Sequence, residues 1–220
     1  MSTPIPCLDL LILGAALAPS GFSSALCSIA RPAPRGDINA FTLLVTTGIY
    51  PVIISAAILV RPELGFFHWP KVVFYLLALL AAPVGLALEY LLQGLFIYLR
   101  TGKRARGLTL HASLGTKLPL SYVLNLTLIP IGQELVYRQI WFVLLAQAFH
   151  FPPAAVILIS ALSFGLDHLF WGLGTVALKS LTGALYGCLY FFSGSAIIVP
   201  ILAHILQNWL LLLLARRKNA

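Results

Sequence analysis

The sequence predicts an all-α fold, a polytopic transmembrane helix bundle of about seven spans, with six to eight as the range. Of the 220 residues, 60% are hydrophobic and only 9% are charged, and the mean hydropathy is +0.97. A soluble domain of this length would carry about a quarter charged residues. Repeated apolar windows of about 20 residues, the length that crosses ~30 Å of hydrocarbon, give the span count.

The predicted spans follow one another along the chain, with turn-forming residues between most of them. Their windows are residues 8–30, 41–60, 71–99, 118–150, 153–171, 176–193 and 197–215. The third and fourth windows are long enough to tilt, break or re-enter the membrane, so the exact count depends on them. No soluble domain fits between the spans.

The distribution of charge predicts the orientation and argues against a nucleic-acid partner. The net charge is +8, and the basic residues crowd the loop at 100–117 and the end of the chain at 216–218. The positive-inside rule then places the C-terminus in the cytoplasm and the N-terminus outside. We expect the lipid bilayer as a partner and no nucleic acid, since exposed aromatics do not interleave the basic residues.

The first apolar window favours a retained span in a bacterial inner membrane. No Lys or Arg precedes it, so it lacks the basic segment of a cleaved signal peptide. The short chain and the lack of a targeting segment favour the bacterial location.

Five strongly polar side chains lie inside the apolar windows and predict a buried reaction centre. They are Glu134, Arg138, His168, His204 and Asn208. A charge near the bilayer centre costs at least ~2.5–3.5 kcal/mol, so a charge that persists there faces a partner or a wet cavity. Each of these residues has an alternative structural interpretation, but their concentration in three windows favours a common site.

Two of the three groups are pairs at i,i+4, which share one face of a helix. Glu134 and Arg138 form the first pair, with an interhelical ion pair as the structural alternative. His204 and Asn208 form the other and supply two N–H donors suited to an oxyanion. Hydrogen bonding between helices is the alternative there.

The remaining group is Asp167 followed by His168. A lone histidine on an apolar helix is more often a core residue whose hydrogen bonds are satisfied than a catalyst. On a helix, Asp167 would lie about 100° around from His168, so the two need not serve one site.

A carboxylate, an imidazole and a donor pair inside a membrane suit amide hydrolysis. The carboxylate and the imidazole take a proton from water, and the donor pair stabilises the tetrahedral oxyanion. Apolar surroundings strengthen each of these interactions. No serine, cysteine or pair of aspartates offers a better nucleophile. We therefore expect a membrane peptide or protein as the substrate.

The ordered set of three motifs resembles the intramembrane glutamate proteases. Glu134-x-x-x-Arg138, Phe164-x-x-x-His168 and His204-x-x-x-Asn208 follow one another about 35 residues apart. This family is the CAAX-protease and bacteriocin-processing family, which includes the type II CAAX prenyl endopeptidase and the abortive-infection proteins. The resemblance covers roughly residues 118–212.

The resemblance implies a bundle of about eight helices with a membrane-embedded active site. We expect one membrane domain in three parts: the N-terminal helices and basic loop at residues 1–117, a protease-like core at 118–215 and a basic tail at 216–220. The resemblance also implies that Glu134, His168, His204 and Asn208 are catalytic. His168 would help to activate water, His204 and Asn208 would hold the oxyanion, and Arg138 would support the carboxylate.

We expect no cofactor and no metal. Glu134, His168 and His204 could form a zinc set, but they lack the H-E-x-x-H spacing of zinc proteases, so zinc is the minority alternative.

Gln133 departs from the family pattern, in which the first motif opens with two glutamates and the first activates the water. Glutamine cannot act as a base. Three interpretations stay open: Glu134 takes the role with Gln133 as a positioning residue, Asp167 supplies the missing carboxylate, or the protein is inactive. We favour the first as a hypothesis, since the rest of the set is complete.

Two other functions remain as alternatives. An inactive homologue would bind membrane peptides as a scaffold, and Gln133 is the best evidence for it. A transporter would use Glu89 and Gln93, which also stand at i,i+4, together with the polar cluster as its pathway.

Overall fold

The computed structural model describes residues 6–30, 40–103 and 120–219, and these ranges contain helices, turns and no strand. The helices in chain order are α1 (Pro6–Ala15), α2 (Pro19–Ala30), α3 (Ala40–Val60), the 3-10 helix η1 (Pro62–Gly65), α4 (Val72–Thr101), α5 (Leu120–Glu134), the π-helix η2 (Leu135–Ile140), α6 (Trp141–Val143), the π-helix η3 (Leu144–Ala148), α7 (Pro153–Leu166), the 3-10 helix η4 (Leu169–Trp171), α8 (Leu173–Phe192) and α9 (Ile198–Asn219). The predicted all-α fold is confirmed.

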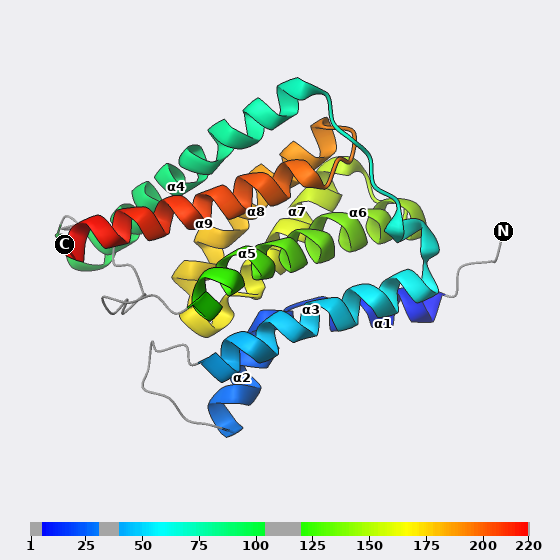
Figure 1. The fold of residues 1–220 in the computed structure, drawn as a ribbon, viewed down its shortest axis with the longest axis horizontal. Coiled ribbons are helices and arrows are strands. Elements are labelled where there is room, and N and C mark those ends of the chain that lie inside the picture. Colours follow the sequence, from blue (N-terminus) through cyan, green and yellow to red (C-terminus); the bar gives the residue numbers. More distant parts are fainter. Residues whose placement is uncertain (1–5, 31–39, 104–119, 220) are drawn as a thin grey trace.

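Four long helices form a row, and two more lie across it. Helix α4 packs on α9, α9 on α5 and α5 on α3, so these helices lie side by side in that order (Figure 1). Helices α7 and α8 pack tightly on each other behind this row, and α8 also contacts α4 and α9. The N-terminal helices α1 and α2 pack on α3 at the edge of the bundle.

Each predicted apolar window contains helix in its described residues, but these helices differ in whether they are long enough to span a membrane. By length and composition, three helices in the described part of the chain can cross a membrane: Phe41–Val60, Val72–Thr101 and Leu173–Phe192. The bent pair Cys7–Ala15 and Pro19–Ala30 adds a fourth if it forms one span, and α7 and residues 198–214 of α9 are shorter apolar helices. Large apolar side chains such as Leu59, Val72 and Leu173 stand exposed, which suits contact with lipid tails. The chain is therefore an integral membrane protein.

Within the window at 118–150, residues 120–148 form one continuous helical stretch that is widened into π-helix at two places, η2 and η3. The stretch continues through Pro130, and the first π-segment begins directly after Glu134. Single π-turns inside helices are rare and often mark functional sites. This widening lies where the predicted polar cluster begins.

The helix of the first window is interrupted, and side chains of the core hydrogen-bond the backbone carbonyl groups at the interruption. Helices α1 and α2 meet at 57°, and Pro19 opens α2, as suits the first position of a helix. The indole of Trp141 donates to the carbonyl oxygen of Ala16 (3.1 Å), and the Tyr137 hydroxyl donates to that of Leu17 (3.3 Å). Backbone groups freed inside a membrane must find such partners.

Small residues let α7 and α8 approach each other closely, as the spacing of Gly183 and Gly187 predicts. A Cβ at Gly183 would lie 2.9 Å from the Phe164 ring and 3.2 Å from the Ala161 backbone. A Cβ at Gly187 would lie 3.3 Å from Ile157. This packing fixes the position of Phe164, which lies in the middle of the polar cluster.

Two segments between predicted windows fall outside the described residues: the turn-forming residues 31–37, between the first two windows, and most of the basic loop at 100–117. The predicted basic tail at 216–220 is helical up to Asn219, because α9 continues to that residue.

Candidate active site

Four elements bring the predicted site residues together. Glu134 ends α5 and Arg138 lies in the π-helix η2, while His204 and Asn208 lie in α9. The expectation that His168 lies on a helix is wrong, because α7 ends at Leu166 and His168 precedes the 3-10 helix η4. The end of α7 turns this segment toward α2 and frees the imidazole from the helix face.

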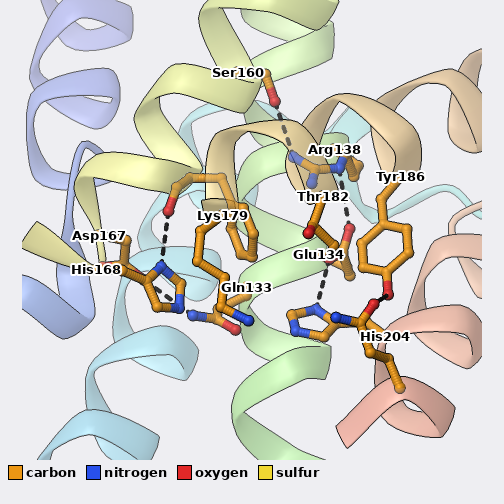
Figure 2. Close-up of polar contacts among 12 residues, drawn as sticks. Gln133, Glu134, Arg138, Ser160, Asp167, His168, Lys179, Thr182, Tyr186 and His204 are labelled. Carbon is orange, nitrogen blue, oxygen red and sulfur yellow. Dashed lines mark hydrogen bonds and ion pairs between the residues drawn. The ribbon is translucent and has the colours of Figure 1, made fainter. Parts of the chain in front are cut away.

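Glu134 lies at the centre of the buried cluster (Figure 2). One carboxylate oxygen, Oε1, accepts from Nδ1 of His204 at 2.8 Å. The other, Oε2, lies 3.0 Å from Nε of Arg138. Both Glu134 and Arg138 are completely buried. A carboxylate without solvent needs this compensation, because each isolated ion would cost several kcal/mol to bury.

Arg138 is itself held in place by the core. Its Nη1 donates to the Ser160 hydroxyl (3.1 Å), which in turn donates to the backbone carbonyl of Tyr137 (2.6 Å). The guanidinium lies 5.3 Å above the Phe164 ring. Arg138 therefore has two roles at once. It joins α7 to η2 through Ser160, and it fixes the Glu134 carboxylate.

Both imidazoles are anchored through Nδ1. His204 Nδ1 contacts the Glu134 carboxylate, and His168 Nδ1 lies 3.0 Å from the carbonyl oxygen of Phe164. A carbonyl or a carboxylate can only accept, so each Nδ1 carries the proton. In the neutral rings, Nε2 is then an acceptor, which can take a proton from water.

The Phe164 ring lies between the two imidazoles. Its centroid is 5.1 Å from that of His168 and 5.6 Å from that of His204, both in edge-to-face geometry. This arrangement packs the apolar body of each ring and leaves its polar edge for the neighbouring cavity.

A cavity of about 220 Å³ adjoins the cluster and has room for several water molecules. Helices α2, α3, α5, α8 and α9 and the segment after α7 line it; the lining residues are Ser20, Ser24, Thr42, Leu43, Thr46, Asn125, Leu126, Ile129, Pro130, Gln133, Asp167, His168, Trp171, Lys179, His204 and Asn208. Glu134 and Arg138 are not among them. The structure therefore places the Glu134 carboxylate behind the cavity wall and the two imidazoles and Asn208 on it.

Asp167 accepts four hydrogen bonds and closes the wall on the side of α2. Its Oδ1 accepts from the backbone N–H groups of Ser20 (2.6 Å) and Gly21 (3.2 Å). Its Oδ2 accepts from the Tyr50 hydroxyl (2.9 Å) and from Nε2 of Gln133 (3.1 Å). The N-terminus of a helix favours an anion, so Asp167 stabilises the start of α2. With four donors its lone pairs are engaged, which disfavours a role as base.

Gln133 suits this partner better than glutamate would. Its amide donates to Asp167, whereas a carboxylate at that place would meet another carboxylate about 3 Å away. The departure from the family motif thus has a local physical reason.

Sequence reasoning missed Tyr50, Ser20 and Lys179. The first two belong to other windows and carry no charge. Lys179 has the same signal that singled out the five predicted residues, an ionisable group within an apolar window, and it lines the cavity.

The alternative zinc set of Glu134, His168 and His204 does not fit this arrangement. Both oxygens of Glu134 are already engaged, one by Nδ1 of His204 and the other by Arg138, so this carboxylate is not available as a metal ligand. Within residues 6–30, 40–103 and 120–219, no three His, Cys, Asp or Glu side chains converge as metal ligands.

The fold and the cluster together define an integral membrane protein with a helix-lined cavity that polar side chains reach. Residues 115–210, less than half of the chain, match the model of a family described as type II CAAX prenyl endopeptidase Rce1-like. This match confirms the resemblance that the three motifs predict, and the family is one of peptidases. No curated protein and no solved structure matches the chain.

Proposed function

We propose that the protein is an intramembrane endopeptidase that hydrolyses a peptide bond of a membrane-associated or lipidated peptide or protein. The observation that carries the proposal is the buried pair of Glu134 and His204 beside a cavity lined by His168 and Asn208. The family match over the same residues supports it. The reaction needs no metal, and water is the nucleophile.

In this proposal Glu134 acts through His204. The carboxylate fixes the imidazole in the tautomer whose Nε2 is an acceptor and stabilises the imidazolium that forms when Nε2 takes a proton. Glu134 is then a positioning residue, and His204 is the general base. This assignment revises two expectations. Glu134 does not itself receive the proton, since no solvent reaches its carboxylate, and His204 acts as the base rather than as an oxyanion donor, since its Nε2 is an acceptor in the neutral ring.

The reaction follows from this arrangement. His204 Nε2 takes a proton from a water molecule oriented by His168, and the water oxygen adds to the carbonyl carbon of the substrate. The carbonyl electrons move to its oxygen, which the Asn208 amide stabilises. When the oxyanion collapses, the C–N bond breaks, and the imidazolium returns the proton to the leaving amine. The protein ends in its starting state.

One observation favours a second function, an inactive scaffold that binds membrane peptides. By the motif resemblance, Gln133 stands where the family has its water-activating glutamate. The carboxylate that lines the cavity beside it, Asp167, is engaged by four donors. If neutral His204 is too weak a base for amide hydrolysis, the cavity would bind a peptide without cutting it.

For the location we propose a bacterial inner membrane, with the N-terminus outside and the C-terminus in the cytoplasm. The charge distribution along the sequence supports this orientation.

The test is peptide cleavage by purified protein in lipid nanodiscs, read by mass spectrometry over a broad panel of lipidated and unmodified peptides. We expect cleavage by the wild type, loss of at least about 10²-fold in His204→Ala and His168→Ala, and no loss in His68→Ala, a matched control at an exposed histidine. A wild type that binds panel peptides but cleaves none would establish the scaffold function instead.

A further inference from the structure

Lys179 is a partly buried cation that faces the cavity. It lies in α8, and its side chain extends toward Gln133 (Figure 2). Its Nζ lies 2.7 Å from Oε1 of Glu89 in α4, and the two side chains are only 19% and 13% exposed. The Thr182 hydroxyl donates to the same Glu89 oxygen at 2.9 Å.

The ion pair with Glu89 explains how the membrane tolerates Lys179, but not why its side chain reaches the cavity. A pair that served only to join α4 to α8 would need no access to this space. Lys179 lines the cavity and Glu89 does not. The ammonium group has three N–H donors, of which Glu89 takes one, so two remain for a bound group.

Of the charged side chains Lys179 and Asp167 on the cavity wall, Lys179 is available to a bound group and Asp167 is not. Among the lining residues, Asp167 and Lys179 are the charged side chains besides the histidines. The Asp167 carboxylate is engaged by α2, Tyr50 and Gln133. Along the part of the wall that the described residues form, an entering group therefore meets one available charge, and it is positive.

We propose that Lys179 is a further catalytic residue, which donates to the oxygen that becomes negative in the tetrahedral intermediate. This inference rests on the proposed function. As water adds to the carbonyl carbon, the π-electrons of the C=O bond move to its oxygen, and a Lys179 N–H hydrogen-bonds that oxygen together with Asn208. When the C–N bond breaks, the electrons return to the C=O bond. The Lys179 proton is not transferred, and Glu89 and Thr182 are positioning residues.

A fixed cation in a cavity between membrane helices is well suited to this task. Its attraction to an oxyanion is weakly screened there, and it needs no reorganisation as the charge develops. An amide such as Asn208 supplies only a dipole. Loss of one oxyanion donor costs on the order of 10²–10³-fold in rate in characterised hydrolases.

The test compares the binding of two tetrahedral peptide analogues of the same sequence by calorimetry in nanodiscs. A peptide phosphinate carries the negative charge of the intermediate, and the matching hydroxyethylene peptide is neutral. We expect Lys179→Met to weaken phosphinate binding at least about 10-fold and hydroxyethylene binding less than about twofold. Lys179→Arg should retain most of the difference, and Lys71→Met, an exposed lysine outside the cavity lining, should change neither.

Each other outcome overturns the inference. Equal weakening of both analogues by Lys179→Met would mean a role in shape alone, and no weakening would mean that Lys179 only pairs with Glu89. Both analogues are also made with free and amidated C-termini. If the effect of Lys179→Met follows the terminal carboxylate rather than the phosphinate, Lys179 binds the end of the substrate and not the oxyanion.

This readout separates the inference from the proposed function. Analogue binding needs no turnover, so a wild type that cleaves nothing but distinguishes phosphinate from hydroxyethylene through Lys179 would contradict the peptidase activity alone. A wild type that cleaves peptides while Lys179→Met binds both analogues unchanged would contradict the Lys179 inference alone.

Discussion

Nδ1 of His204 and Oε1 of Glu134 lie 2.8 Å apart, although the two residues are 70 positions apart in the chain. This contact joins α9 to the end of α5 and fixes the imidazole with its other nitrogen toward the cavity. It therefore joins the first and third motifs into one chemical unit.

Replacing Glu134 with glutamine should abolish most activity while keeping the shape of the side chain. We expect a fall of about 10²–10⁴-fold in peptide cleavage, because the amide neither stabilises an imidazolium nor fixes its tautomer. The melting temperature should also fall, since Arg138 loses its buried counter-ion. Glu63→Gln, at an exposed acid, is the control. Full cleavage by Glu134→Gln would contradict the proposed role.

Gln133 and Asp167 should show strong coupling in a double-mutant cycle. Gln133→Glu alone brings two carboxylates together, and Asp167→Asn alone places two amides in contact, so each should lower the melting temperature in nanodiscs. The double variant restores a donor and an acceptor, and we expect it to recover about 1–3 kcal/mol of coupling. Additive effects would show that the hydrogen bond contributes nothing.

The same double variant tests whether the site can use a glutamate. Peptide cleavage above the wild-type rate would mean that a carboxylate at position 133 is a better base than His204. Unchanged cleavage would support the pair of Glu134 and His204 as the working base.

An alanine at Gly183 should disturb the site by packing alone. The new methyl group would meet the Phe164 ring at 2.9 Å and the Ala161 backbone at 3.2 Å, and Phe164 contacts both imidazoles. We expect a loss of about 1–3 kcal/mol in stability, with reduced cleavage. Gly94→Ala, where a Cβ would meet nothing within 4 Å, should leave both unchanged. Equal melting temperatures for the two variants would refute this packing argument.

Chelators should leave cleavage unaffected. Both oxygens of Glu134 are engaged, by His204 and Arg138, so this carboxylate is not free to complete a zinc set with His168 and His204. The measurement is the initial rate after dialysis against EDTA and after addition of zinc. Loss of activity that zinc restores would overturn the metal-free mechanism.

Much of the site could be predicted from the sequence, because a polar residue inside a membrane span is costly and therefore usually marks a functional site. Glu134, His168, His204 and Asn208 stand out against an apolar background, and helical spacing pairs two of the groups. Lys179 carries the same signal, so the criterion could have found it. The end of α7 could not be predicted, since no glycine or proline stands between Leu166 and His168.

The contacts of Asp167 were also beyond sequence reasoning. Its partners Ser20 and Gly21 lie 147 and 146 positions away, and nothing local indicates that a helix N-terminus would meet this carboxylate. The break in the first window was more accessible, because Pro19 is a typical opening residue of a helix. What the break contacts depends on the tertiary fold.

The broken first window has a consequence for engineering this protein. Residues inside the family match, Asp167, Tyr137 and Trp141, hydrogen-bond backbone groups of residues 16–21, far outside it. A chimaera that joins the matched segment to foreign leading helices would leave these side chains without their partners in the hydrocarbon. The leading helices are therefore not an interchangeable anchor, and a minimal version of the protein has to retain them.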